Sequence, residues 1–230
     1  MAVNLKRYSV FYSKKKYTQD FLRLYNISAI SGVENPQDFQ KWHNGGGTFH
    51  QSACIDPTVL IEVGAIVHSK ALLGANVCIG SGAVVGPSVT IGQSTKIGYN
   101  VALSNCIVGD SCAIHNGVCI GQDGFGFFVN EHGNMVKKPQ MLIARIGNRV
   151  EIGANSCIDR GWIGDYETLG GRVAVRDHVS IASKVRLAAN CCVTKDITEP
   201  GDYGGFPAVP IREWRRQVAN QFRISKKGTP

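Results

Sequence analysis

Aliphatic residues recur at every sixth position through most of this 230-residue chain. Glycine often follows the aliphatic residue, and a small or β-branched residue usually stands at the fifth place of the six-residue unit. A sustained period of this length is typical of a parallel β-helix. With three units in each triangular coil, the pattern predicts roughly seven stacked coils over residues 55–200. The aliphatic positions are Ile55, Ile61, Val67, Leu73, Ile79, Val85, Ile91, Ile97, Leu103, Val108, Ile114, Ile120, Ile146, Ile152, Ile158, Ile163, Leu169, Val175, Ile181, Leu187 and Val193.

The first segment of the chain has a different composition. Residues 1–35 mix Lys and Arg with aromatic and aliphatic residues and contain no acidic residue before Asp20. This composition favours an organelle transit peptide over a secretory signal, and the scarcity of serine favours the mitochondrion, with the chloroplast as the alternative. A basic disordered leader is the other interpretation of the same residues.

Both ends of the predicted β-helix need caps, because unpaired strand edges would otherwise stay exposed. Residues 36–54 are predicted to be a connector that supplies the first cap. Residues 201–230 are predicted to be a helix and tail that supply the second, with Pro210 at the helix start. The apolar residues of this helix share one face: Ile211, Trp214, Val218 and Phe222.

The repeat is broken at length only once, by an inserted loop at residues 121–145 that holds three phenylalanines among glycines. Loops of this length with apolar residues of their own are often functional. A smaller irregularity follows, because Ile158 and Ile163 are five residues apart instead of six. That shortened unit predicts a strained corner at Trp162.

The charge and the cysteine content limit the classes of partner and site that the chain can have. The net charge of +8 favours an acidic partner, whereas an aromatic content of 8% without a recognisable nucleic-acid-binding motif speaks against nucleic acid. The eight cysteines form no Cys-x-x-Cys pair, so no zinc or redox motif is predicted and a reducing compartment is favoured. No stretch approaches ~20 consecutive apolar residues, so no transmembrane segment is expected.

Three stretches in and after the loop carry a specific resemblance. Residues 114–127 read I-H-N-G-V-C-I-G-Q-D-G-F-G-F, residues 137–140 read K-K-P-Q, and residues 146–161 contain I-G-N-R-V-E-I-G-A followed by I-D-R-G. They resemble the UDP-3-O-acylglucosamine N-acyltransferases, which read I-x-x-G-x-x-I-G-x-D-G-F-G-F, K-x-P-Q and I-G-x-x-V-E-I-G-A-x-x-x-I-D-R-G. The resemblance extends over about residues 50–224.

That resemblance implies a left-handed parallel β-helix of hexapeptide repeats, assembled as a homotrimer. It also implies an acyltransferase that moves a hydroxyacyl chain from the thioester of acyl carrier protein to the 2-amine of a UDP-3-O-acylglucosamine. The pathway implied is lipid A biosynthesis, a branch of lipid metabolism. No cofactor and no metal ion are implied, because the carrier thioester itself is the donor substrate.

The chain departs from the family pattern in two places. The N-terminal uridine-binding domain is absent and the leader stands in its place, as in organelle-targeted plant members. The segment I-D-N-x-x-Q-I-x-H-N, whose His is the general base of the family, is also missing, since Ile158-Asp159-Arg160-Gly161 continues through Trp162 directly into Ile163.

His178 is the best candidate for a remaining catalytic group. Residues 170–178 resemble the family's G-G-x-V-x-x-x-x-H, whose His assists in the active site, and imidazole suits proton transfer from an attacking amine. A solvated surface histidine is the alternative. Phe125, Phe127 and Phe128 of the loop could wall an acyl channel or merely anchor the loop, and Arg176 could hold a phosphate or phosphopantetheine group. The predicted substrate-binding residues are Asp123, Phe125, Phe127, Lys138, Gln140, Asp159, Arg160 and Arg176.

Two functional hypotheses follow. The first is an N-acyltransferase acting on the UDP-sugar acceptor, with acyl carrier protein as partner. The alternative is a non-catalytic β-helix isoform or subunit that co-assembles with a full-length enzyme, as the missing segment would suggest.

Overall fold

The computed structural model describes residues 34–124 and 126–227, with side chains up to residue 221. A compact unit spans Pro36–Pro230, and the description below concerns that unit. The predicted leader falls almost wholly outside the described residues, as do Phe125 and the side chain of Phe222. These predictions, and the domain boundaries drawn from the sequence, stay predictions.

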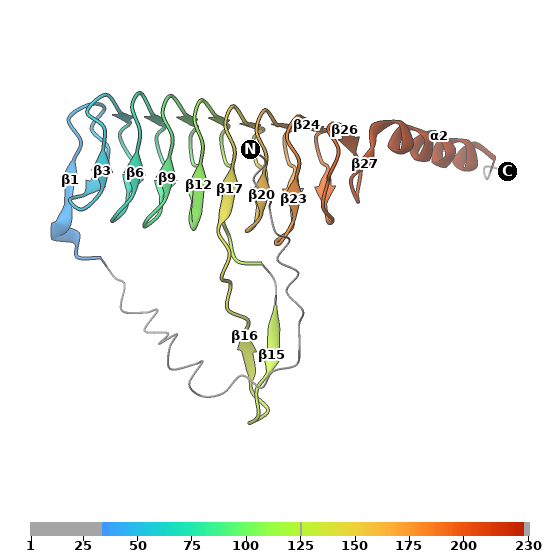
Figure 1. Ribbon diagram of the computed structural model, residues 1–230, viewed down its shortest axis with the longest axis horizontal. Helices are drawn as coiled ribbons and strands as arrows, with labels where there is room; N and C mark the ends of the chain where they lie inside the picture. The colour runs from blue at the N-terminus through green and yellow to red at the C-terminus, as the bar shows by residue number, and fades with distance from the viewer. Residues whose placement is uncertain (1–33, 125, 228–230) are drawn as a thin grey trace, which may run out of the picture. The chain divides into compact units, whose positions relative to one another are not determined.

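The chain winds into a parallel β-helix, as the six-residue period predicted (Figure 1). Each coil contributes one short strand to each of three sheets, and within the described residues seven coils carry all three strands. The sheets are described by their strands in chain order.

The first sheet contains β1 (Phe39–Lys41), β2 (Thr48–His50), β5 (Ile66–Val67), β8 (Val84–Val85), β11 (Ala102–Leu103), β14 (Cys119–Ile120), β19 (Cys157–Ile158), β22 (Ala174–Val175) and β25 (Cys192–Val193). The second contains β4 (Leu60–Ile61), β7 (Cys78–Ile79), β10 (Lys96–Ile97), β13 (Ala113–Ile114), β18 (Glu151–Ile152), β21 (Thr168–Leu169), β24 (Val185–Leu187), β26 (Gly201–Gly204) and β27 (Val209–Pro210). The third contains β3 (Cys54–Ile55), β6 (Leu72–Leu73), β9 (Thr90–Ile91), β12 (Cys106–Val108), β17 (Ala144–Ile146), β20 (Trp162–Ile163) and β23 (Ser180–Ile181).

The aliphatic residue of each unit points into the coil. Ile97, Ile114 and Ile152 are consecutive register partners on β10, β13 and β18, and all three are buried. The fifth place of the unit also points inward, which explains its preference for small and β-branched side chains. Glu167 occupies such a place and is only 1% exposed, so one carboxyl group lies inside the coil.

The connector caps the first coil. It begins with a short 3-10 helix, η1 (Pro36–Asp38), and then β1 runs antiparallel to β2, which pairs in parallel with β5. The indole of Trp42 donates a hydrogen bond to the carbonyl of Val59 (2.8 Å) and packs against the core. The first sheet therefore ends in an antiparallel strand.

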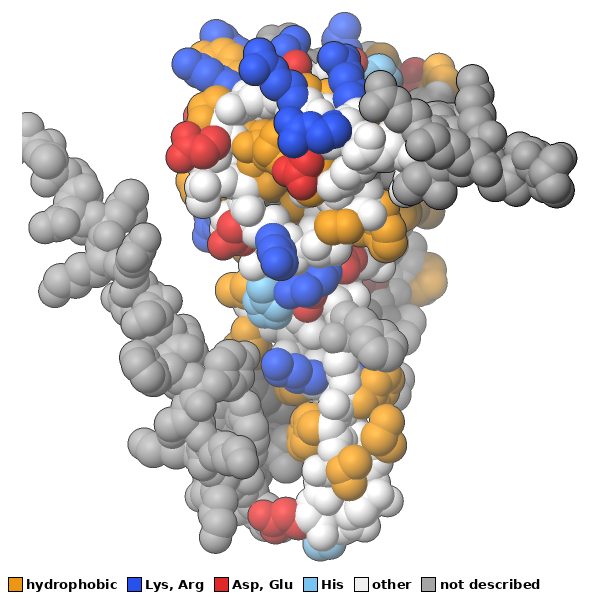
Figure 2. Space-filling model, turned by 90° about the vertical axis from the view of Figure 1, so that its right-hand side faces the viewer, with side chains coloured by type: hydrophobic (Ala, Val, Ile, Leu, Met, Phe, Trp, Pro, Cys, Tyr) orange, Lys and Arg blue, Asp and Glu red, His pale blue; other side chains and the backbone are white. Residues whose placement is uncertain are grey.

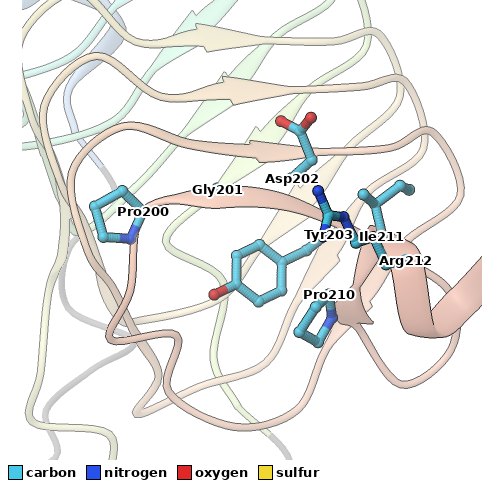
Figure 3. Close-up of a pocket in the computed structure, with 7 residues that line it drawn as sticks. All are labelled: Pro200, Gly201, Asp202, Tyr203, Pro210, Ile211 and Arg212. Carbon is cyan, nitrogen blue, oxygen red and sulfur yellow. The ribbon is translucent and has the colours of Figure 1, made fainter.

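The C-terminal cap consists of β26, β27 and the helix α2 (Ile211–Lys227), which leaves the end of the β-helix in Figure 1. Close packing explains why Gly204 has no side chain, because an added Cβ would lie 3.0 Å from Ile211 Cδ1 and 3.1 Å from Trp214 Cε3. A hollow of about 310 Å³ lies beside this junction, lined by residues 200–203 and 210–212 (Figure 3). None of the sequence-predicted site residues lines it.

A hairpin of β15 (Phe127–Val129) and β16 (Met135–Lys137) projects from the coils within the inserted loop (Figure 1). Most of its apolar residues, including Val129 and Met135, are exposed. In the part of the chain that the structure describes, no helix has the length and apolarity needed to cross a membrane.

Candidate functional site

The predicted site residues lie at one corner of the β-helix, where the chain passes from the first sheet to the third. Strands β14, β19 and β22 are neighbours in the first sheet, so the segments that follow them are stacked on one another. These segments are the inserted loop, the corner Asp159–Gly161 and the corner that contains His178. The repeat therefore brings together residues that are up to 55 positions apart (123 to 178).

Arg160 anchors the inserted loop to the coil. Its side chain is 10% exposed, and its guanidinium donates hydrogen bonds to the carbonyls of Gln140 (2.8 Å) and Leu142 (3.0 Å). The same group pairs with the carboxylate of Asp123 at 2.5 Å. Nε of Arg160 has no hydrogen-bond partner among the described residues. The guanidinium of Arg160, which was predicted to bind substrate, is thus engaged by both ends of the loop.

Asp123 has a second cationic partner, Lys137, whose Nζ lies 2.5 Å from Oδ2. The hydrogen bond from Lys137 and the nearby Arg160 lower the pKa of Asp123 against the opposing effect of burial. This carboxylate is therefore held ionised between two cations. Lys138 was predicted to bind substrate, and that remains a prediction; it is the neighbouring Lys137 that contacts Asp123. The backbone N–H of Lys138 donates to the carbonyl of Gly126 (3.0 Å).

The shortened unit before Ile163 seats the loop, and the strain expected at Trp162 is not found. Trp162 N donates to the carbonyl of Val179 (2.9 Å) and Arg145 N donates to the carbonyl of Gly161 (2.8 Å), so the corner is paired on both sides. None of residues 159–162 has a positive φ. The coil on the other side of the loop has the same five-residue spacing, from Leu103 to Val108. Two short corners thus flank the base of the loop.

Asp177 connects the loop to His178. A Cβ on Gly124 would overlap the Asp177 carboxylate, so glycine is needed for the loop to approach this close. Nε2 of His178 lies 3.5 Å from Oδ2 of Asp177, and the backbone N–H of His178 donates to the carbonyl of Arg160 (2.8 Å). An acid beside an imidazole can orient the ring and stabilise its protonated form. The cluster therefore contains a carboxylate–imidazole pair.

Asp159 lies next to this pair. Burial, and then the charge of Asp177, raise the pKa of Asp159 above its usual value. Arg176 stands on the other side, with Nε 3.6 Å from Oδ1 of Asp177. The candidate site thus combines two neighbouring carboxylates, an imidazole and an arginine whose side chain is mostly exposed.

His178 adopts a left-handed backbone conformation with φ 61°. Asn76 and Asn100 adopt the same conformation at other corners, and both are exposed. The ring is 48% exposed. The corner therefore places an accessible imidazole beside the loop.

The structure brings six of the nine predicted residues into this cluster, whereas Phe127 and Lys138 lie with the hairpin and Phe125 is outside the described residues. The six are Asp123, Gln140, Asp159, Arg160, Arg176 and His178. Phe127 lies on the projecting hairpin and is 53% exposed. Sequence reasoning missed Asp177, although it stands in the Arg-Asp-His run that drew attention to His178. No group of three metal-ligating side chains occurs within the described residues.

Comparisons with known proteins agree with the fold and the motifs. Residues 36–136 match the family model described as GlmU-like, C-terminal hexapeptide. A probable UDP-3-O-acylglucosamine N-acyltransferase 2, mitochondrial, from Arabidopsis thaliana is 59% identical over 237 residues, covering 85% of this chain and 78% of that protein. A UDP-3-O-acylglucosamine N-acyltransferase from Janthinobacterium sp. (strain Marseille) is 34% identical over 158 residues, covering 50% of this chain and 45% of that protein.

Among solved structures, a UDP-N-acetylglucosamine acyltransferase from Campylobacter jejuni matches with a TM-score of 0.47 and 20% identity, covering 70% of this chain and 72% of that one. The hexapeptide repeat places the chain in the class of β-helix proteins with such repeats. More narrowly, the extent of the Arabidopsis match shows that the chain belongs to the UDP-3-O-acylglucosamine N-acyltransferase family.

The chain is shorter than its relatives, and it spans less than half the length of the bacterial ones. Part of the difference is internal. The Arabidopsis match is 237 residues long, whereas 85% of 230 residues is about 196, so about 40 residues of the relative have no counterpart inside the matched region. This difference agrees with the missing segment inferred from the motifs.

Proposed function

We propose that this chain transfers an acyl group from a carrier thioester to the 2-amine of a UDP-3-O-acylglucosamine. The observation that carries the proposal is the Asp177–His178 pair, at 3.5 Å, beside the loop whose sequence is typical of the family. The reaction needs a group that accepts a proton from the attacking amine, and the accessible ring of His178 is placed to do so.

The amine nitrogen attacks the thioester carbonyl carbon, and the C–S bond breaks as the amide C–N bond forms. His178 takes the proton that the nitrogen loses and returns it to the departing thiolate, so proton and charge balance over the cycle. Asp177, whose carboxylate lies 3.5 Å from the ring nitrogen, orients the imidazole. In this chain His178 takes the place of the base carried by the segment that is missing.

An acidic carrier protein suits the charge of this chain. The net charge is +8, and the helix α2 contributes exposed Arg212, Arg215 and Arg216. Figure 2 shows Lys and Arg side chains gathered in the upper part of the face from which α2 projects. Complementary charge speeds the encounter of two proteins more than it deepens their affinity. This supports acyl carrier protein as the donor, with no cofactor required.

The assembly and location belong to the same proposal. A homotrimer would give the exposed apolar residues of the loop a surface to pack against, among them Met135 and Met141. The name of the Arabidopsis relative supports a mitochondrial location. The pathway we propose is that of lipid A-type glycolipids.

Replacing His178 with alanine tests the mechanism. We expect kcat for N-acyl transfer from a purified acyl carrier thioester to fall by roughly 100-fold or more, with KM changed little, because proton transfer is lost while binding groups remain. Added imidazole should restore part of the rate. Asp177→Asn should cause a smaller loss in kcat.

The matched control is His115→Ala. His115 is also an exposed corner histidine paired with an acid, since its Nε2 lies 2.8 Å from Glu151 Oε1, yet it belongs to a different corner. This variant should keep the full rate. If kcat fell equally in both histidine variants, the assignment of His178 as the base would be wrong.

The alternative function is a non-catalytic subunit, which the missing base segment favours. Three results together would establish this alternative. The protein would fold and bind UDP-acylglucosamine, would show no turnover at any pH, and would co-assemble with a full-length relative. Turnover that His178→Ala abolishes would exclude it.

A further inference from the structure

Two cysteines face each other on the outside of the first sheet. Cys119 on β14 and Cys157 on β19 are direct register partners in neighbouring parallel strands. The residues that follow them, Ile120 and Ile158, are buried, so the two cysteine side chains point outward. Cys157 is exposed and Cys119 is half-buried, and both are free thiols.

The spacing of the strands permits a bond between them. Neighbouring strands lie about 4.8 Å apart, which falls within the ~4.4–6.8 Å range of Cα separations found in disulfides. In-register parallel neighbours keep their Cβ atoms wider apart than the ~3.8 Å mean of a relaxed disulfide. A bond here would therefore be formed at some strain and would be readily reduced.

The surroundings of Cys157 also affect the pKa of its thiol. Burial raises the pKa of Cys157, and the neighbouring Cys119 and Asp159 raise it further. The thiol is therefore largely protonated near neutral pH, and its oxidation should speed up as pH rises.

No other pair among the described cysteines has this arrangement. Cys54 faces Leu72 across the third sheet, and Cys192 faces Ala174 across the first. On the far side of each cysteine, the register partner in the next strand of the first sheet is an alanine. Ala102 faces Cys119 and Ala174 faces Cys157, and these small side chains leave room around the sulfur atoms. The remaining cysteines are Cys78, Cys106, Cys112 and Cys191.

We propose that Cys119 and Cys157 form a reversible redox site that a peroxide converts to a cross-strand disulfide. One thiolate attacks the peroxide, the O–O bond breaks, and a sulfenic acid forms with release of water or an alcohol. The second thiolate then attacks that sulfur, so the S–S bond forms and a water molecule leaves. Each sulfur loses one electron, and the peroxide takes up both.

The position of the bond gives it a structural consequence. Cys119 lies directly before the inserted loop, and Cys157 lies two residues before Asp159 on the strand that leads to Arg160. The disulfide would join the strand where the loop begins to the strand whose corner anchors it. It would thereby restrict separation of the loop base from its anchor.

The experiment uses the whole reduced protein and hydrogen peroxide as the oxidant, followed by alkylation of remaining thiols and mass spectrometry. We expect two fewer alkylated thiols, a cross-linked peptide joining Cys119 to Cys157, and full reversal by dithiothreitol. The rate should increase between pH 7 and pH 9. Neither Cys119→Ser nor Cys157→Ser should form the bond.

Cys192→Ser is the matched control, because Cys192 faces outward in the same sheet with Ala174 between it and Cys157. This variant should oxidise like the parent chain. A bond from Cys157 to Cys192, a bond between two chains, or oxidation of single thiols only would overturn the proposal. The measurement does not depend on acyl transfer, so it tests the redox proposal independently of the proposed activity.

Discussion

Replacing Glu167 with valine should make the protein markedly more stable at pH 8. Glu167 points into the coil, is 1% exposed, and neither of its carboxylate oxygens has a hydrogen-bond partner among the described residues. Its neighbours at the equivalent places of the adjacent coils are Val150 and Val185, both buried, so valine suits the position. Burial raises the pKa of Glu167 to about 7, and the Val185 backbone offsets this only in part.

The pH dependence follows from the two pKa values. In the unfolded chain the carboxyl group has its ordinary pKa of 4.5, whereas in the folded chain, with a pKa of about 7, it holds its proton up to about pH 7. The folded state therefore binds more protons at Glu167 in this window, so the contribution of this group to stability is greatest below pH 4.5 and is lost as pH rises to about 7. The shift corresponds to a loss of roughly 3 kcal/mol.

Thermal unfolding of the two proteins at pH 4.5 and pH 8 measures this effect. We expect the valine variant to gain roughly 3 kcal/mol over the parent at pH 8 and clearly less at pH 4.5, which would raise Tm by about 10 °C at the higher pH. Glu167→Gln is the control, because it removes the titrating group but keeps a buried polar side chain. A parent–valine difference that is the same at both pH values would show that Glu167 is solvated.

Glu167 also shows what the sequence could have revealed. The fifth place of each unit predicts an inward side chain, and Glu167 is the only charged residue at such a place in the regular six-residue units. The inward direction of the position was therefore predictable from the repeat. The pKa was not, because it depends on which neighbouring groups lie within reach of the carboxylate.

The fold was predictable because a β-helix is built from local repetition. Each unit sets its own strand and corner, and stacking follows from the period, so the predicted aliphatic positions are the ones found on the strands. For the caps, the sequence predicted that a connector and a helix close the two ends, but not how they pack. The pairing of β1 with β2 and the packing of Trp214 against Gly204 depend on contacts that no period encodes.

The site was predictable only where motif and repeat coincide. The stacking of His178 over Arg160 follows from the order of the coils, and both were named from their motifs. The roles of Lys137 and Asp177 depend on how the inserted loop folds back, and a 25-residue interruption carries no period from which to infer that path. The short corner before Ile163 was misjudged for the same reason, since the loop that it seats is what makes its length appropriate.

Arg160 is the residue whose loss should release the loop. Arg160→Met removes a largely buried guanidinium that binds two carbonyls and Asp123, leaving these acceptors without it. Because the Asp123 carboxylate is 37% exposed and retains Lys137, solvent and that lysine compensate in part. We expect the loop to lose about 2 kcal/mol of anchoring, while the coils keep their core.

Limited proteolysis and hydrogen exchange measure that release. Opening of the loop should become roughly 30-fold more frequent, seen as faster cleavage after Lys137 by trypsin and after Glu131 by a glutamate-specific protease. Arg160→Lys should behave nearly as badly, because one ammonium group cannot reach acceptors arranged for a planar fork. Arg145→Met, which removes an exposed arginine from β17 at the very end of the loop, should leave both cleavage rates unchanged. If Arg160→Met is cleaved at the same rate as the parent protein, the hairpin and Lys137 hold the loop without the guanidinium. The five-residue corner that places Arg160 under the loop would then have no role in anchoring it.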